Sequence, residues 1–409
     1  MTTEITKIIE GFKHFSENPY LDSINFLREY IEVESSSEAF FELGKALFFN
    51  GDYEESIAYL NKSNDWRCDA YIGLNHFKTN NHESAIKHFR RFLKQKQNET
   101  ILSYLMISYE RIRDWKNAII CGEILLEINP ENNSVKVHLA DYHFKRREYE
   151  RSLTYLNELD GMKYKYRKGL ILFKLKRYTD AIDELKNLKT LEAYRLMSKS
   201  YEKLGKHAKA VMCMQNAYKR DYDVEILFEI SEIYSKNRNY QNSITILERI
   251  LKDEPKNEKA LEMIAENYFE LQNFELALSY CNDLLEVNEN NFKAYLILSE
   301  TCMYIDDTHK VMEYVEKGLK INPQSAELWI QKAWAYYPTD FDEFKRAFEK
   351  ALELEANNIK NHIKLIEQCL WADDEESAHR YYERLLFYNP SYARSFEEIH
   401  DRILKIRNL

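Results

Sequence analysis

Glycine, proline and long apolar runs are scarce in this chain of 409 residues. Its nine glycines and six prolines are too few for a string of loosely linked domains, and they favour an almost wholly helical protein. Because no stretch approaches about 18 uncharged apolar residues, we expect no membrane insertion. The first residues, MTTEITKIIEGFKH, lack the apolar core and cleavage site of a secretory signal, so we expect a cytoplasmic protein.

Motifs for catalysis, phosphate binding and metal binding are also missing. The sequence contains no glycine-rich phosphate loop, no H-E-x-x-H pair and no C-x-x-C pair. Its six cysteines are widely scattered, which predicts reduced and mostly buried thiols. His138 and His143 stand five residues apart, so their rings should point to different sides of a helix. We therefore expect no enzyme, no cofactor and no metal site.

Aromatic residues are plentiful, at 14% with 30 tyrosines, and charge is unevenly spread. The net charge of -10 arises from about -5 in residues 1–50, about +7 in residues 51–250 and about -12 in residues 251–409. The chain is therefore electrically polarised along its length.

A short helical hairpin recurs along the chain. In ELGKALFFNGDYEESIAYL, residues 42–60, Leu43 and Leu47 share one helical face before Gly51 ends the helix, and a second helix follows. The small residue of that second helix, Ser56, has equivalents at intervals of 29, 33 or 34 residues. Another small residue usually stands twelve positions earlier, which lets paired helices approach closely.

Prolines punctuate this repeat, since Pro130, Pro255, Pro323 and Pro390 each fall just beyond a second helix. The pattern resembles the tetratricopeptide repeat family, most clearly in LSYLMISYERIRDWKNAIICGEILLEINP at residues 102–130. The resemblance covers nearly the whole chain. It implies an all-α, right-handed superhelical solenoid of about twelve helix-turn-helix repeats.

We expect the solenoid to span residues 1–392 and a capping helix to follow at residues 393–409, where apolar residues form one stripe. A dimerisation seam is the alternative for that stripe, and the oligomeric state stays open. Three repeats, 37–65, 133–161 and 162–190, are about five residues short, which predicts shorter second helices or exit loops. The eleventh repeat, with Pro338 in its turn, is the expected bend. The repeats begin near residues 4, 37, 66, 99, 133, 162, 191, 224, 258, 292, 326 and 359.

The resemblance also implies that the second, fifth, ninth, twelfth and thirteenth residues of each repeat face a concave groove. No repeat has the Lys and Asn pair that chaperone-binding members carry at the fifth and ninth places. Apolar residues gather near the N-terminus at these places, and glutamates replace asparagine at the ninth place further on. The predicted partner-binding residues are Phe12, Phe41, Lys45, Phe48, Leu74, Phe77, Ile107, Arg167, Lys199, Glu232, Glu266, Glu300 and Glu367.

We expect a protein-interaction scaffold that holds a protein or peptide segment in its groove, with a basic stretch of the partner against Glu232, Glu266 and Glu300. Each apolar ring has packing inside the fold as its alternative, and each glutamate a solvated wall. Two other functions stay open. One is a regulatory or recruiting subunit of an enzyme that acts on glycans or cell-surface polymers; the other, less favoured, is nucleic-acid binding by the basic residues within 51–250.

Overall fold

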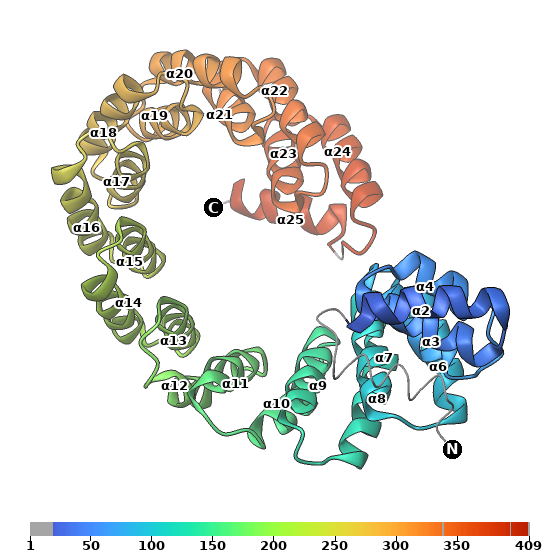
Figure 1. Ribbon diagram of the computed structural model, residues 1–409. Coiled ribbons are helices and arrows are strands. Elements are labelled where there is room, and N and C mark those ends of the chain that lie inside the picture. The colour runs from blue at the N-terminus through green and yellow to red at the C-terminus, as the bar shows by residue number, and fades with distance from the viewer. Residues whose placement is uncertain (1–18, 338, 393, 408–409) are drawn as a thin grey trace. The chain divides into compact units, whose positions relative to one another are not determined.

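The computed structural model describes residues 19–407 apart from residues 338 and 393, and all regular structure in those residues is α-helical (Figure 1). The 24 helices described there follow one another as helix-turn-helix pairs. The prediction of an all-α solenoid of helical repeats is confirmed. The chain divides into two compact parts, Met1–Leu204 and Gly205–Leu409, and each is described by itself.

In the N-terminal part, the first helices of the repeats carry the apolar residues at helical spacing, and four of them begin after a side chain that caps the helix: Ser36, Asn98, Asn132 and Thr190. They are α3 (Ser37–Asn50), α5 (Cys68–Lys78), α7 (Glu99–Arg111), α9 (Asn133–Lys145), α11 (Met162–Lys174) and α13 (Leu191–Lys203). The second helices are α2 (Pro19–Val33), α4 (Tyr53–Leu60), α6 (His82–Gln95), α8 (Trp115–Ile128), α10 (Tyr149–Asn157) and α12 (Tyr178–Leu185).

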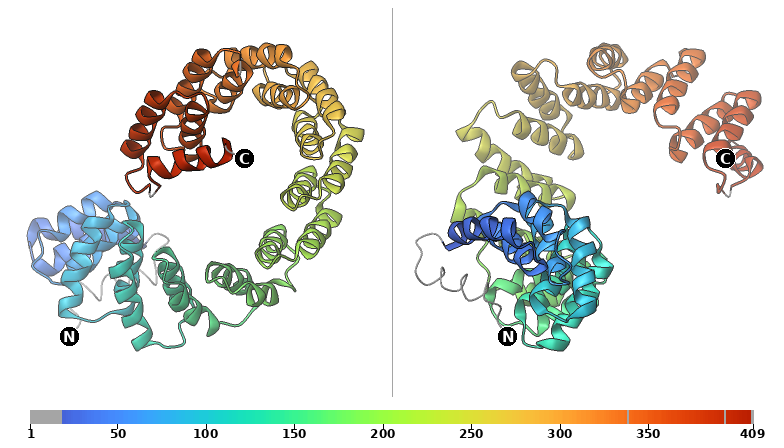
Figure 2. Two further views of the ribbon diagram at one scale, coloured as in Figure 1. Left: turned by 180° about the vertical axis from the view of Figure 1, so that it is seen from behind. Right: turned by 45° about the vertical axis from the view of Figure 1, so that its right-hand side comes forward.

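In the C-terminal part, the first helices form one layer and the second helices form the other (Figures 1 and 2). The first helices are α15 (Val224–Lys236), α17 (Glu258–Glu270), α19 (Phe292–Tyr304), α21 (Ala326–Tyr336) and α23 (Ile359–Trp371). The second helices are α14 (His207–Asp221), α16 (Tyr240–Asp253), α18 (Phe274–Val287), α20 (Thr308–Ile321), α22 (Phe341–Leu354) and α24 (Glu375–Tyr388). The bend expected at Pro338 lies outside the described residues.

The second helices of the short repeats lose about one and a half turns. Helices α4 and α12 have 8 residues and α10 has 9, whereas α6 and α8 have 14. The shorter length of these three repeats in the sequence predicted this shortening. The turns that join paired helices are unaffected by it.

Paired helices touch where the sequence places small residues. A Cβ atom on Gly44 of α3 would lie 2.5 Å from the Cγ of Leu60 on α4. A Cβ atom on Gly169 of α11 would lie 2.7 Å from the Cγ of Leu185 on α12. Contacts this short leave no room for a methyl group, so glycine is required for the helices to stay at this separation.

On the facing helix, a buried serine also allows the two paired helices to lie close together. The hydroxyl of Ser56 donates to the carbonyl of Gly44 at 2.6 Å, and that of Ser152 donates to the carbonyl of Ala140 at 2.6 Å. Both serines are fully buried. The short side chain therefore satisfies its own hydrogen bond while it allows the backbones to come close.

The turns between paired helices need one residue in the left-handed region, and glycine supplies it at Gly51, with φ of 96°. Gly205, with φ of 69°, does the same between α13 and α14. In the other turns longer side chains adopt this conformation at a modest cost, which explains how the chain manages with so few glycines. They are Asn80, Arg113, Arg147, Lys176, Arg238, Gln272, Asp306 and Asp373.

A last helix, α25 (Phe396–Arg407), packs against α23. Phe396 and Ile399 are buried, and the Phe396 ring lies 4.0 Å from that of His379 on α24. The side chains of Ile403 and Ile406 are outside those described. The first half of the expected apolar stripe thus covers the end of the C-terminal part.

Substituting Gly169→Ala should lower the free energy of unfolding by about 1–3 kcal/mol, because the new methyl group would press on Leu185. In an unconstrained helix the same change stabilises by about 0.5–1 kcal/mol, so the sign itself is informative. Urea denaturation followed by circular dichroism measures it. Lys174→Ala, at an exposed position of α11, is the control and should change the value by less than about 0.5 kcal/mol. A stabilised Gly169→Ala variant would contradict the close approach of α11 and α12.

Candidate functional site

The first helices of the C-terminal part line two adjoining cavities. One, the α15–α19 cavity, has a volume of about 540 Å³, and the other, the α19–α23 cavity, about 420 Å³. Leu296 and Glu300 of α19 line both. The surface formed by α15, α17, α19, α21 and α23 is therefore hollowed continuously across successive repeats.

Carboxylates from three repeats meet in the α15–α19 cavity. Glu232, Glu266 and Glu300 follow one another at intervals of 34 residues in the sequence, and all three line this cavity. Glu270 adds a fourth carboxylate and accepts a hydrogen bond from the hydroxyl of Tyr240 at 3.0 Å. The cavity is thus an acidic wall built from equivalent places of adjacent helices.

Basic side chains offset only part of this charge. Glu232 lies 3.5 Å from the ammonium group of Lys236, and both groups are exposed. Glu266 and Glu300 make no ion pair or hydrogen bond with any residue in the described part of the chain. The nearby Lys293 forms its ion pair with Glu262, so Glu266 and Glu300 are not neutralised by direct contact with a basic group.

The pKa values of these two carboxyl groups lie above their ordinary value. Partial burial raises the pKa of Glu266, and Glu262 and Glu270 raise it further against the opposing effect of Lys293. Partial burial also raises the pKa of Glu300, with Glu270 and Glu327 adding to the effect. Both shifts mean that the folded chain disfavours the charged forms.

A buried polar network fixes the position of α17 beside α15 and α16. The side-chain amide nitrogen of Asn267 donates to the hydroxyl of Ser243 at 2.8 Å, and the side-chain oxygen of Asn267 accepts from the hydroxyl of Ser235 at 2.7 Å. Ser231 and Ser243 also share a hydrogen bond of 2.6 Å. Asn267 follows Glu266 directly, so this network holds the carboxylate-bearing turn in place.

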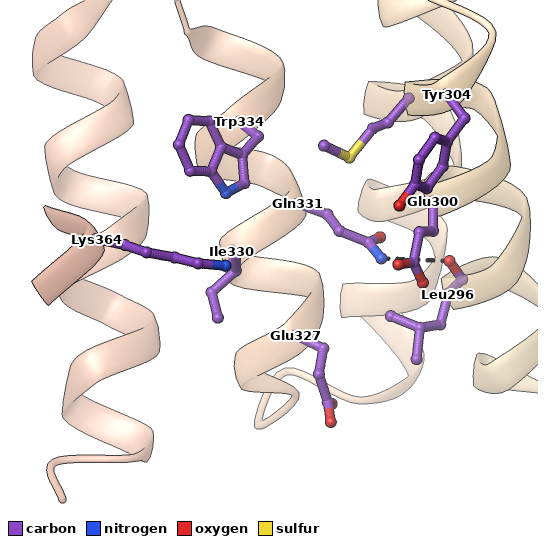
Figure 3. Close-up of a pocket in the computed structure, with 9 residues that line it drawn as sticks. Leu296, Glu300, Tyr304, Glu327, Ile330, Gln331, Trp334 and Lys364 are labelled. Carbon is purple, nitrogen blue, oxygen red and sulfur yellow. Dashed lines mark hydrogen bonds between the residues drawn. The ribbon is translucent and has the colours of Figure 1, made fainter. Parts of the chain in front are cut away.

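Aromatic and polar residues line the α19–α23 cavity together (Figure 3). Trp334 of α21 and Tyr304 of α19 lie toward one end of the cavity, and Glu327 lies toward the other. Between them, the buried Gln331 donates to the carbonyl of Leu296 at 3.4 Å, which ties α21 to α19.

Several lining residues were not among the predicted ones. Trp334 stands at the ninth place of its repeat, where the three preceding repeats carry glutamate. Glu327 stands at a second place, and Glu270 and Tyr304 stand at thirteenth places. Reading all groove-facing places in every repeat, without requiring the same residue type to recur, would have found them.

Glu367 does not join the other ninth-place glutamates. It is half-buried and lines neither cavity, whereas Lys364 of the same helix, α23, lines the α19–α23 cavity. A repeating place in the sequence therefore does not guarantee a common surface at the end of the row.

The expectation that Phe41 lines a docking surface is wrong. Its side chain is only 3% exposed and packs against Leu60 and Ile72. The guanidinium group of Arg67 covers the ring at 4.2 Å, and Tyr71 meets it edge-on at 5.7 Å. The following repeat thus closes over this fifth-place ring, so Phe41 belongs to the core.

The other apolar residues of the N-terminal set are half-buried. Leu74, Phe77 and Ile107 pack against the core that α5 to α9 share, and the Phe77 ring lies 4.9 Å from that of Tyr104. Phe48 contacts three neighbouring rings, the nearest centred 5.2 Å away. Phe12 lies outside the described residues. Most of the predicted apolar surface is therefore engaged in packing.

The predicted basic residues differ in their surroundings. Lys45 pairs with the buried Glu42 at 3.0 Å, and Lys199 is exposed on α13. Arg167 lines a cavity of about 410 Å³ in the N-terminal part, where it pairs with Asp141 at 3.2 Å. Acidic neighbours thus neutralise part of the basic stretch.

The described residues contain no cluster of three or more His, Cys, Asp or Glu suited to a metal ion. Burial raises the pKa of Cys121, Cys281 and Cys369 to about 12, which disfavours a reactive thiolate. None of the helices described has the length and apolar character needed to cross a membrane.

Substituting Glu300→Gln should raise the free energy of unfolding at neutral pH. A carboxyl whose pKa is higher in the folded chain than in the unfolded chain destabilises the fold when charged, and the loss disappears as pH falls toward the ordinary value of 4.5. The gain over wild type should shrink over the same pH range, as urea denaturation at a series of pH values would show. Glu316→Gln, exposed on α20, is the control. A gain that is independent of pH would contradict the raised pKa.

Phe41→Ala should lower the free energy of unfolding by about 3–5 kcal/mol, because it leaves a cavity under Arg67 and Tyr71. Phe49→Ala, at a ring that is 48% exposed, should cost clearly less. Thermal unfolding of both variants makes the comparison. Equal stability of the two variants would restore Phe41 as a surface residue.

Two family models match the sequence. The model described as "Anaphase-promoting complex, cyclosome, subunit 3" matches residues 112–188 and 236–318. The model described as "Tetratricopeptide repeat" matches residues 37–67 and 191–223. The matches interleave along the chain and together cover more than half of it. A comparison with curated proteins finds no significant match.

Many solved structures match the chain. The structure described as "Structure of Naa15/Naa10 bound to HypK-THB" matches 99% of this chain and 73% of its own, with a TM-score of 0.50 and 13% identity. The C-terminal part of a TPR repeat-containing protein from Cytophaga hutchinsonii matches 57% of this chain and 98% of its own, with a TM-score of 0.42 and 17% identity.

At 13% identity, the likeness to the Naa15/Naa10 structure shows the fold alone. The sequence models and the helical hairpins, with small residues at both contact places, agree on the family. The chain belongs to the tetratricopeptide repeat proteins.

Proposed function

We propose that this chain is a protein-interaction scaffold that holds a lysine- and arginine-rich segment of a partner against the acidic wall of the α15–α19 cavity. One observation carries the proposal: Glu266 and Glu300 come from successive repeats, line one cavity and make no ion pair with any described residue. Repeats of this family are protein-interaction modules, which agrees with a role in binding and not in catalysis.

A basic segment would relieve an existing electrostatic cost. Carboxylates at the wall repel one another, and partial burial strengthens the repulsion because water screens it less. Positive groups of a partner would replace this repulsion with attraction and would also be steered toward the wall before contact. The strongest effect is therefore expected on the association rate at low salt.

Nucleic acid is the less favoured ligand. Phosphates would meet the same repulsion at the acidic wall, and the basic residue Arg167 of the N-terminal part already pairs with Asp141. A protein segment with positive side chains fits the charges of the wall without rearrangement.

The triple variant Glu232→Gln, Glu266→Gln and Glu300→Gln should bind a basic peptide about tenfold more weakly at low salt, because three lost charge pairs of about 0.5 kcal/mol each add up to about 1.5 kcal/mol. The probe is a fluorescein-labelled peptide of alternating glycine and lysine, measured by fluorescence anisotropy with the full chain. The loss should shrink at high salt, and stopped-flow mixing should show it mainly in the association rate. The variant should remain as stable as wild type or become slightly more stable.

A matched triple variant separates the site from net charge. Glu248, Glu286 and Glu316 are exposed on the second helices α16, α18 and α20 of the same part, and their change to Gln removes the same charge. This control should bind the peptide nearly as well as wild type. Equal losses in both variants, or no binding by wild type at low salt, would overturn the proposal.

A further inference from the structure

The α19–α23 cavity presents aromatic rings that are held rigidly from behind. The Trp334 indole meets the rings of Phe344 and Phe348 edge-on, at 5.4 and 6.3 Å between centroids. Tyr304 is 64% exposed, but its ring stacks on Phe274 at 5.4 Å. Both rings are therefore fixed by neighbours while they remain open toward the cavity (Figure 3).

Carboxylates accompany these rings within the same cavity. Glu300 is half-buried and Glu327 is exposed, and neither makes an ion pair with a described residue. Glu327 accepts a hydrogen bond from the hydroxyl of Ser325 at 3.2 Å, which leaves most of its acceptor capacity open. The cavity thus joins aromatic faces with two carboxylates that lack counter-ions.

A hydrogen-bond donor also faces this space. The indole nitrogen of Trp334 lies on the side of the cavity in Figure 3, and its N–H has no acceptor among the described residues. Such a donor suits a backbone carbonyl of a bound segment. The volume of about 420 Å³ accommodates a long side chain together with part of its backbone.

One resident cation borders the cavity. Lys364 extends from α23 toward α21, and its ammonium group makes no ion pair with the carboxylates of the described residues. It is therefore not the counter-ion of Glu300 or Glu327, and it opposes a positive ligand by charge repulsion.

We propose that the α19–α23 cavity is a pocket for an arginine side chain of the bound segment, with the guanidinium group between the aromatic rings and the carboxylates. This inference rests on the proposed function, because it assigns the side chain that the scaffold selects. The acidic wall of the α15–α19 cavity does not require an arginine, since it would attract any positively charged side chain.

Arginine fits this lining better than lysine does. A planar guanidinium stacks on an indole or phenol ring while its edge donates two hydrogen bonds to a carboxylate, and an ammonium group cannot do both. Arginine is also less strongly hydrated than lysine, so moving it into a half-buried site loses less solvation. The pocket should therefore discriminate between two side chains of equal charge.

The test compares two labelled peptides, alternating glycine with arginine and glycine with lysine, by fluorescence anisotropy with the full chain at one salt concentration. Wild type should bind the arginine peptide about fivefold more tightly. Trp334→Leu and, separately, Tyr304→Leu should abolish this preference and leave the affinity for the lysine peptide within about twofold. Lys364→Gln should tighten binding of the arginine peptide by about twofold.

Controls keep the outcomes distinct. Phe387→Leu removes another exposed ring, 78% exposed on α24, and should preserve the preference. Because Trp334 also packs against Phe344, circular dichroism should confirm its fold, and the exposed Tyr304 decides the question if that variant unfolds. Equal affinity of wild type for the two peptides, or a preference that survives Tyr304→Leu, would overturn the arginine pocket and leave the scaffold proposal intact. Binding of neither peptide would overturn both.

Discussion

The close approach of paired helices is the constraint on which the rest of this structure depends. At Gly44 and Gly169 even a methyl group would overlap a leucine of the facing helix. The buried serines Ser56 and Ser152 keep the same contact while they hydrogen-bond to backbone carbonyls. Because each pair is held at one separation and angle, successive pairs stack in a regular way, and equivalent residues of adjacent repeats come to lie side by side.

That regular stacking turns a period in the sequence into a charged surface. Glu232, Glu266 and Glu300 are far apart along the chain, yet they line one cavity because each occupies the same place on its helix. The fold tolerates their repulsion since the buried network around Asn267 and the leucine contacts of the core stabilise the repeats independently of the wall. A binding partner that relieves the repulsion among these glutamates would therefore gain free energy without any loss of contacts that stabilise the fold.

The limits of sequence reasoning are clear at particular residues. Phe41 occupies a place that faces the groove in the family, but Arg67 and Tyr71 of the next repeat cover it. The family pattern describes where a Cα–Cβ bond points and does not say which neighbour fills the space beyond it. Trp334 and Tyr304 were missed for the opposite reason, because their places change residue type from one repeat to the next and leave no recurring signal.

The sequence by itself determined the family, the all-helical fold and the alignment of the glutamates, because small residues, turn residues and prolines at a fixed period admit only one way of pairing and stacking short helices. Only the tertiary structure decided which groove-facing side chains are free. Lys364 reaches the cavity while Glu367 of the same helix does not, and Glu300 lacks a basic partner while Glu262 is paired with Lys293 at 2.7 Å. Burial and ion pairing depend on the lengths and conformations of side chains from neighbouring repeats. A repeat period in the sequence does not specify how far apart those side chains lie.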